Sequence, residues 1–209
     1  MKLVIFGATG AAGRPLIEQA VAAGHEVAAV ARDPSRIGLR HERLRAVQGD
    51  VTDAASVASA IEGNEGVISA VGPSKGTPPG TLISGALRHI LEGMRRHGVR
   101  RLVLTSGLMV GEARGAGIVQ RLALRVFRRM NAALYRDKVL AEWLVRESDR
   151  EWVIVRPPLF DLRAPRGAWR MGEDLDVKMG TMSAADVAGA LLQAVDEERF
   201  LRKAVELSY

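Results

Sequence analysis

Residues 3–13 read Leu-Val-Ile-Phe-Gly-Ala-Thr-Gly-Ala-Ala-Gly and join a short apolar run to a glycine-rich turn. The three glycines are spaced three residues apart, and an amphipathic stretch follows them. In a strand–turn–helix unit such glycines allow a tight turn, a close approach of the backbone to phosphate, and close packing of the helix. The free N–H groups at the start of that helix bind pyrophosphate. We expect a dinucleotide loop formed by Gly7, Thr9, Gly10, Ala11, Ala12 and Gly13.

An isolated glycine motif is a weak signal, and a turn without a ligand is the alternative. The rest of the chain argues against that alternative, because short apolar runs alternate with longer amphipathic stretches. Strands are expected at 2–6, 26–31, 44–48, 66–71, 101–105 and 152–155, with another near 204–208. Helices are expected at 12–23, 53–61, 81–97, 118–147 and 184–196. This order predicts an α/β fold: a single Rossmann-like, doubly wound parallel sheet with helices on both faces.

We expect one NAD(P)-binding domain over residues 1–209, without repeats or linkers. Two irregular stretches, 72–80 and 156–180, follow strands at their carboxyl ends, where open α/β sheets bind ligands. The second would form a small C-terminal region on the substrate side. Ser183 and Asp186 resemble a capping box before the last helix, and Thr52 or Asp53 would cap an earlier one.

Composition narrows the class of protein. The 209 residues are 47% hydrophobic, include no cysteine and carry a net charge of +6. Disulfides, thiol catalysis and cysteine-bound metal are therefore excluded, and four scattered histidines do not suggest a metal site. The basic residues do not form blocks interleaved with aromatics, so we expect no nucleic-acid partner. No apolar run approaches the roughly 20 residues of a membrane helix and no signal peptide is evident, so we expect a cytoplasmic protein.

The end of the second expected strand indicates which dinucleotide binds. An acid at this place accepts the ribose 2′-hydroxyl of NAD, whereas arginine accommodates the 2′-phosphate of NADP. Arg32 stands there, and Ser35 and Arg36 can complete a phosphate site. Asp33 keeps NAD(H) open, and an ordinary solvated turn is the alternative to both. We expect NADP(H) to be preferred.

Two further strand ends supply candidate contacts to the cofactor. Asp50 can accept from the adenine amine while Val51 packs on the ring, although Asp50 can equally cap the next turn. At the end of the fourth strand, Ala70, Val71 and Gly72 offer backbone with little side chain beside the ribose and nicotinamide.

These residues resemble the atypical short-chain dehydrogenase/reductase group that includes flavin reductases and biliverdin-IXβ reductases, over essentially the whole chain. The matching segments are 6–13, 30–36, 49–51, 94–99, Leu-Thr-Ser at 104–106, Val-Arg-Pro-Pro at 155–158 and Ser-Ala-Ala-Asp-Val-Ala at 183–188. The resemblance implies the same pyrophosphate, 2′-phosphate, adenine and ribose contacts. It also implies that Ser106 lies close to the nicotinamide and the substrate.

Standard short-chain dehydrogenases add Tyr-x-x-x-Lys, in which the tyrosine donates a proton and the lysine lowers its pKa. Here Lys138 keeps its place, but Leu134 stands at the tyrosine position and Tyr135 comes one residue late. Tyr135 and Lys138 can still approach as an i, i+3 pair. We name Ser106, Lys138 and Tyr135 as catalytic candidates, with Lys138 also binding the nicotinamide ribose. The alternatives are a packing role for Tyr135 and a solvent-facing Lys138 paired with Glu142.

The stretch 118–136 is amphipathic and basic, and we expect it to cover the sheet with an arginine-decorated outer face. Contact with a membrane or a partner, or closure over the substrate, are alternatives.

The expected activity is an NADPH-dependent reduction of a planar conjugated acceptor, such as a flavin, quinone or tetrapyrrole. Ser106, Arg156, Pro157 and Pro158 would shape the substrate pocket. A redox sensor that binds NAD(P)(H) without turnover is the main alternative, and a sugar-nucleotide epimerase or dehydratase is a weaker one. The partners expected are the small-molecule acceptor and, at most, a second copy of the chain.

Overall fold

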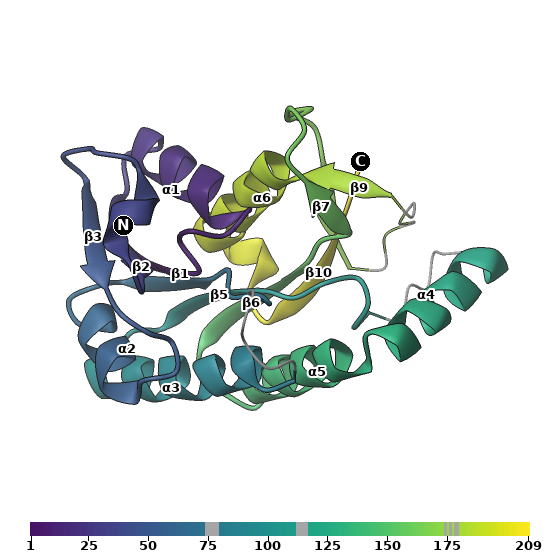
Figure 1. Cartoon of the computed structure of the whole chain (residues 1–209), viewed down its shortest axis with the longest axis horizontal. Helices are drawn as coiled ribbons and strands as arrows, with labels where there is room; N and C mark the ends of the chain where they lie inside the picture. Colours follow the sequence, from purple (N-terminus) through teal and green to yellow (C-terminus); the bar gives the residue numbers. More distant parts are fainter. Residues whose placement is uncertain (74–79, 112–116, 174, 176, 178–179) are drawn as a thin grey trace.

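A computed structural model describes residues 1–73, 80–111, 117–173, 175, 177 and 180–209. Its centre is an eight-stranded sheet with the strand order β3-β2-β1-β4-β5-β6-β10-β8 (Figure 1). The strands are β1 (Lys2–Phe6), β2 (Glu26–Ala31), β3 (Leu44–Gln48), β4 (Gly66–Ser69), β5 (Arg101–Thr105), β6 (Glu151–Arg156), β8 (Arg170–Gly172) and β10 (Lys203–Ser208). Strand β8 pairs antiparallel with β10, and the pairs from β3 to β10 are parallel. The expected doubly wound sheet is confirmed.

Helices cover both faces of this sheet (Figure 1). On one face lie α1 (Gly13–Ala22) and α6 (Ala184–Asp196), and on the other α2 (Ala54–Ile61), α3 (Leu82–His97) and α5 (Ala132–Arg146). Two short 3-10 helices, η1 (Pro34–Ile37) and η2 (Glu198–Phe200), complete the helical elements around the sheet. In the described part of the chain, no helix combines the length and the apolar character needed to cross a membrane.

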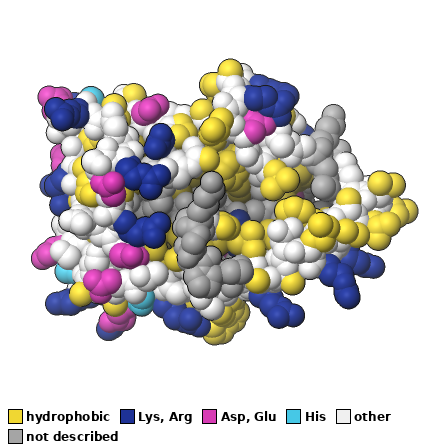
Figure 2. Space-filling view, viewed as in Figure 1, with side chains coloured by type: hydrophobic (Ala, Val, Ile, Leu, Met, Phe, Trp, Pro, Cys, Tyr) yellow, Lys and Arg dark blue, Asp and Glu magenta, His cyan; other side chains and the backbone are white. Residues whose placement is uncertain are grey.

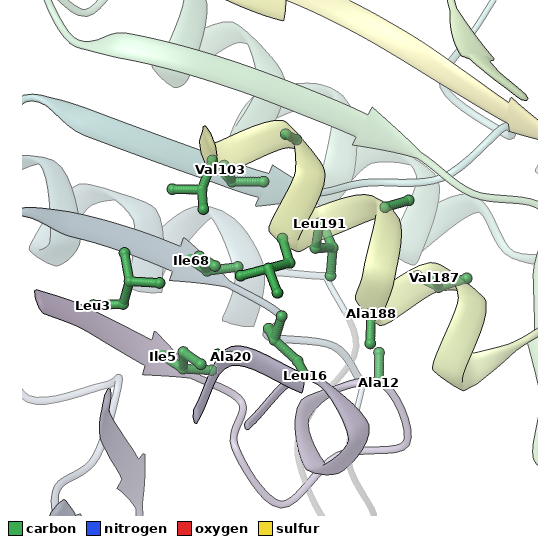
Figure 3. Close-up of a cluster of buried hydrophobic side chains, with 14 of the residues drawn as sticks. Leu3, Ile5, Ala12, Leu16, Ala20, Ile68, Val103, Val187, Ala188 and Leu191 are labelled. Atoms are coloured by element: carbon green, nitrogen blue, oxygen red, sulfur yellow. The ribbon is translucent and has the colours of Figure 1, made fainter. Parts of the chain in front are cut away.

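Two apolar layers result because the side chains of β1 alternate between faces. Leu3 and Ile5 pack against α1 and α6, whereas Val4 and Phe6 pack on the α2–α3 side. Figure 3 shows Leu3 and Ile5 facing side chains of the two helices, including Leu191. Strands buried on both faces read as continuous apolar runs, which is why the sequence locates them well.

The prediction of one helix at 118–147 is wrong, because the structure has two helices there. The first, α4 (Ile118–Met130), ends where the side-chain amide of Asn131 donates to the Phe127 carbonyl at 3.0 Å. Helix α5 then starts anew, with the Tyr135 N–H donating to the Asn131 carbonyl. Helix α5 lies along the sheet, and α4 extends beyond the edge of the sheet (Figure 1). The expectation that the whole stretch covers the sheet is therefore also wrong.

The stretch 156–180 is more ordered than its composition suggests. Strand β7 (Leu159–Asp161) pairs in parallel with β9 (Thr181–Ser183), and β8 extends the main sheet. Strands of three residues are too short to show a period-2 pattern, so the sequence does not reveal them. Strand β4 ends two residues earlier than expected, at Ser69. Residues 74–79 of the expected 72–80 loop lie outside the described residues.

Side-chain caps fix the helix starts. Asp53, not Thr52, caps α2 by accepting from the N–H groups of Ala55 and Ser56. Ser183 accepts from the Asp186 N–H at 3.1 Å, as a capping residue should. The Asp186 carboxylate does not return this bond but accepts from the Tyr209 hydroxyl at 2.6 Å. Only one of the two hydrogen bonds of the expected capping box is therefore present. The Asp186 carboxylate instead ties Tyr209 to α6.

Candidate functional site

The glycine turn between β1 and α1 is packed as a phosphate loop requires. Gly7 has φ +83°, and a Cβ there would lie 2.4 Å from the Ala70 carbonyl oxygen. A Cβ on Gly13 would lie 2.1 Å from the Gly7 carbonyl oxygen, so only glycine lets the helix start this close to the turn. Gly10 and Ala11 are exposed, Thr9 is half-buried, and the Gly10 N–H closes the turn on the Gly7 carbonyl at 2.9 Å.

The start of α1 is open to an anion. Ala12 precedes the helix without a side-chain cap, and the first turn contains no acidic residue. The Arg14 N–H donates to the Gly10 carbonyl at 3.2 Å and Pro15 has no N–H, so the positive end of the helix dipole is the main attraction for an anion here. Arg14, in this same turn, donates to the Arg36 carbonyl at 3.4 Å, which brings a third arginine next to the expected 2′-phosphate residues. Sequence reasoning missed Arg14, although its place directly after the third glycine was a usable signal.

The segment after β2 positions two exposed arginines, Arg32 and Arg36, around a tight turn. The turn is held by Asp33, whose Oδ1 accepts from the Ser35 N–H at 3.1 Å and from the Ser35 hydroxyl at 2.6 Å. This carboxylate oxygen is therefore engaged in capping η1. Arg32 and Arg36 are exposed on the same turn, and their binding to a 2′-phosphate stays a prediction.

Asp50 has the turn-capping contacts that the sequence left open. Its Oδ1 accepts from the Thr52 N–H at 2.9 Å and from the Thr52 hydroxyl at 2.8 Å. The Thr52 N–H lowers the pKa of Asp50 below its usual value; the Thr52 hydroxyl and Arg32 add to this against the effect of burial. Val51 is half-buried, and its carbonyl lies 3.0 Å from Nδ1 of His89. An adenine contact by Asp50 and Val51 stays a prediction.

The end of β4 lies directly beside the glycine turn. The Ala70 N–H donates to the Phe6 carbonyl at 2.9 Å, and a Cβ on Gly7 would meet the backbone of both Ala70 and Val71. Val71 is buried, whereas Ala70 and Gly72 are half-buried. The structure therefore brings this strand end next to the glycine turn, and its contact with the ribose and nicotinamide stays a prediction.

An apolar cavity of about 260 Å³ lies at the carboxyl ends of β5 and β6. Ser106, Pro157 and Pro158, three of the predicted substrate residues, line it. Apolar side chains from α4, α5 and β7 supply other parts of the lining: Leu124, Phe127, Leu134, Leu159 and Phe160. The sequence indicated the stretch 156–180, and as an alternative 118–136, as parts of the substrate side. It did not single out these residues, because their contribution depends on where α4 and β7 lie in space.

Ser106 and Lys138 meet in this cavity. The Lys138 ammonium donates to the Ser106 carbonyl oxygen, and burial lowers the pKa of Lys138 to about 8. The alternative of a solvent-facing lysine paired with Glu142 is therefore wrong. Ser106 is 3% exposed, and its hydroxyl has no hydrogen-bond partner among the described residues. A buried hydroxyl without a partner costs free energy. Ser69, Ser84 and Thr105 share this state, but of these four residues Ser106 is the one that lines the cavity, where a ligand would supply the missing partner.

Helix α5 is held by two buried carboxylates. Asp137 accepts from the N–H groups of Ile83 and Ser84, each at 2.9 Å, and so caps the start of α3. Glu142 binds the Arg156 guanidinium through two bonds of 3.0 and 2.6 Å. Arg156 thus joins β6 to α5 and is not among the described lining residues of the cavity. Its predicted substrate contact is replaced by this structural ion pair.

Tyr135 is not among the described residues that line the cavity with Ser106 and Lys138. Its half-buried ring packs with Met109 and Leu124, and the Arg128 guanidinium lies 5.4 Å from the ring centre. Among the described residues that line the cavity, Leu134 is present and Tyr135 is absent. The structure therefore places Tyr135 beside lining residues of the cavity, and a catalytic role for Tyr135 stays a prediction.

The glycine turn, the start of α1 and the arginine turn lie side by side at the carboxyl ends of β1 and β2. A family model described as NAD(P)H-binding matches residues 7–198. The chain belongs to this NAD(P)H-binding family. The match spans every strand of the main sheet except β1 and β10 and includes both the phosphate loop and the cavity residues.

The chain is similar to proteins of plants and bacteria. An uncharacterized chloroplastic protein of Arabidopsis thaliana is 26% identical over 214 residues, covering 99% of this chain and 76% of the relative. A short-chain dehydrogenase/reductase of Veillonella parvula, solved with NADP, has a TM-score of 0.79 at 18% identity, covering 100% and 94% of the two chains. ChuY, an anaerobillin reductase of Escherichia coli O157:H7, has a TM-score of 0.77 at 22% identity, covering 100% and 97%. The two structures establish the shared fold.

Proposed function

We propose that the chain is an NADPH-dependent reductase that transfers hydride to a planar conjugated acceptor: a flavin, a quinone or a tetrapyrrole. The apolar cavity carries this proposal, because it adjoins the strand ends of the cofactor site and contains the unpartnered Ser106 hydroxyl. NADPH supplies the hydride, and the protein binds, orients and shields the reactants. A largely apolar lining suits a flat ring system better than a sugar nucleotide.

Three arginines support NADPH over NADH. Arg32, Arg36 and Arg14 come together around the turn after β2, where the adenosine 2′-phosphate of NADP would lie. Asp33, the acid that would favour NAD, has Oδ1 committed to Ser35. We propose that NADH binds as the weaker of the two cofactors. The relative solved with NADP supports this assignment.

The polar groups have separate tasks in this proposal. The Ser106 hydroxyl donates a hydrogen bond to the acceptor or to the carboxamide of the cofactor. The Lys138 ammonium, held on the Ser106 carbonyl, donates to the nicotinamide ribose. A flavin or quinone takes its proton from water, so Tyr135 is not needed in the cavity. We also propose the cytoplasm as the compartment, which fits the lack of cysteine.

The test is steady-state oxidation of NADPH with flavin mononucleotide, dichlorophenol-indophenol, a soluble quinone and a bilin. Ser106→Ala should lower kcat/KM for the preferred acceptor by about tenfold or more, the value of one lost hydrogen bond to a developing charge. Ser84→Ala is the matched control, because Ser84 is also buried with an unpartnered hydroxyl but does not line the cavity. The reductase proposal fails if NADPH binds tightly and no acceptor in the panel is reduced.

Such a failure would favour the redox-sensor alternative. The observation behind that alternative is the position of Tyr135 outside the cavity lining, since binding without turnover needs no proton donor. A sensor should show a partner interaction or a change in association state that depends on whether NADPH or NADP is bound. The same result in the presence of efficient turnover would show that both functions exist.

A further inference from the structure

Helix α4 exposes an apolar face of unusual extent. Five of its large apolar side chains are more than half exposed: Ile118 (84%), Val119 (80%), Leu122 (59%), Val126 (52%) and Met130 (79%). At 100° per residue these positions fall within an arc of about 120° on the helix surface. Figure 2 shows hydrophobic side chains gathered over the end of the molecule where α4 projects. We call these five residues the α4 face.

The opposite side of α4 is fixed to the body of the protein. Leu124 is buried against Met109, and the Arg128 guanidinium donates to the carbonyls of Met109 and Gly111. These contacts hold the helix in one rotation, with the α4 face directed outward. The exposure is therefore part of the fold.

The charged residues of α4 itself all have one sign. Residues 117–136 contain five arginines and no acidic residue. Arg125 and Arg129 are exposed and lie at one border of the α4 face. An amphipathic helix with an apolar face and arginines beside it is suited to the headgroup–acyl boundary of an anionic bilayer. A second copy of the chain fits less well, because two-fold packing of α4 on α4 would bring these arginines against each other.

The helix is also one wall of the substrate cavity. Leu124 and Phe127 line the cavity from α4, while Leu159 and Phe160 line it from β7 and are themselves exposed. We propose that α4 docks on an anionic lipid surface through the α4 face, and that the acceptor is a lipophilic quinone drawn from that bilayer. The substrate part of this inference rests on the proposed reductase function. The docking part stands on the geometry and charge of α4.

Docking is tested without turnover, by flotation of the full chain with vesicles. Wild-type protein should float with vesicles of phosphatidylcholine and phosphatidylglycerol, and binding to pure phosphatidylcholine should be at least tenfold weaker. Leu122→Glu/Val126→Glu should abolish binding by placing carboxylates on the α4 face. Arg125→Glu/Arg129→Glu should weaken it at least tenfold. Salt at about 1 M, where the Debye length is roughly 3 Å, should also weaken wild-type binding.

Matched controls separate docking from general effects of charge or folding. Arg88→Glu/Arg96→Glu makes the same charge change on α3 at exposed positions, and should float like wild type. Trp143→Glu places a carboxylate at an exposed apolar position on α5, and should also float. NADPH binding by every variant checks that the sheet is intact. Docking is overturned if wild type ignores anionic vesicles, or if the α4 variants float as well as the controls.

A second copy or an acidic protein as the occupant would also overturn the proposal. The first case would appear as a dimer in sedimentation that Leu122→Glu/Val126→Glu dissociates, without vesicle binding. The acceptor is then tested by comparing a water-soluble quinone with a long-chain quinone dissolved in the vesicles. Leu122→Glu/Val126→Glu should reduce the rate with the vesicle-bound quinone at least tenfold and leave kcat with the soluble quinone unchanged. Loss of both rates would show that the substitutions act on the reductase site or the fold, and would contradict a role of the α4 face limited to docking. Equal retention of both rates would overturn delivery of the quinone from the membrane.

Discussion

Lys138 offers the sharpest test, because the structure predicts opposite effects of one substitution on stability and on function. Burial lowers the pKa of its ammonium from 10.5 to about 8. At about 1.36 kcal/mol per pKa unit, this shift means that the buried charge of Lys138 lowers the free energy of unfolding by roughly 3 kcal/mol. Lys138→Met removes that cost but also removes the hydrogen bond to the Ser106 carbonyl, which contributes about 1.5–2 kcal/mol. The variant should therefore be more stable by about 1–2 kcal/mol near pH 7.

The sign of the pH dependence follows from the direction of the shift. Between about pH 8 and 10.5 the unfolded chain binds the lysine proton and the folded protein does not, so wild-type stability rises with pH in this window. The advantage of Lys138→Met should be largest below about pH 8 and should shrink above it. Thermal unfolding should show a Tm about 3–6 °C higher for the variant near pH 7, and a smaller difference near pH 10.

The same variant should bind NADPH about tenfold more weakly, because the ribose loses a charged donor. Lys203→Met is the matched control: Lys203 is exposed on β10, 3.9 Å from Glu173, and its loss should change stability by less than about 0.5 kcal/mol. Equal or lower stability of Lys138→Met at pH 7, or a Tm difference that does not change with pH, would show that burial of the Lys138 charge does not destabilise the fold. Higher stability with undiminished NADPH affinity would remove Lys138 from the proposed cofactor site.

Three further predictions concern α3 and the cofactor turn. In urea unfolding, Gly85→Ala should stabilise the protein by roughly 0.5–1 kcal/mol, since a Cβ at this position meets nothing within 4 Å. Gly93→Ala should destabilise it by about 1–3 kcal/mol, since a Cβ there would lie 2.8 Å from the Ile61 side chain. Stability changes of the same sign in the two variants would contradict the packing of α3. Asp137→Ala should lose about 2–3 kcal/mol by uncapping α3, and unchanged urea unfolding would exclude the cap. Arg32→Ala should raise the Kd of NADPH about tenfold in a fluorescence titration and leave that of NADH unchanged, and an equal change in both would remove Arg32 from 2′-phosphate recognition.

The fold was predictable because its signals are local. The run from Leu3 to Phe6 is buried on both faces, and Gly7 and Gly13 stand where a Cβ would collide with backbone. Each of these features is visible within a few residues of sequence. The break at Asn131 was not, because asparagine within an amphipathic pattern is compatible with a continuous helix until its amide is seen to bond back to Phe127.

The substrate side was predicted less completely for a related reason. Ser106, Pro157 and Pro158 follow strands, so their meeting at one edge of a parallel sheet is a consequence of the fold. Leu124 and Phe160 reach the cavity from α4 and β7, which lie where they do through long-range packing. Periodicity identifies α4 as amphipathic but does not indicate what its apolar side contacts, so the expectation that it covers the sheet was wrong.

The contacts of the charged residues of α5 could not be predicted from local sequence patterns, because each is made to a different element. Within six residues, Asp137 caps α3, Lys138 binds the carbonyl at the end of β5, and Glu142 holds Arg156 of β6. The lysine can remain charged in its buried position because the two carboxylates raise its pKa against the larger effect of burial. Loss of either carboxylate should therefore weaken the fold and lower the pKa of Lys138 further. The helix that anchors the domain thus also sets the charge state of the group proposed to bind the cofactor.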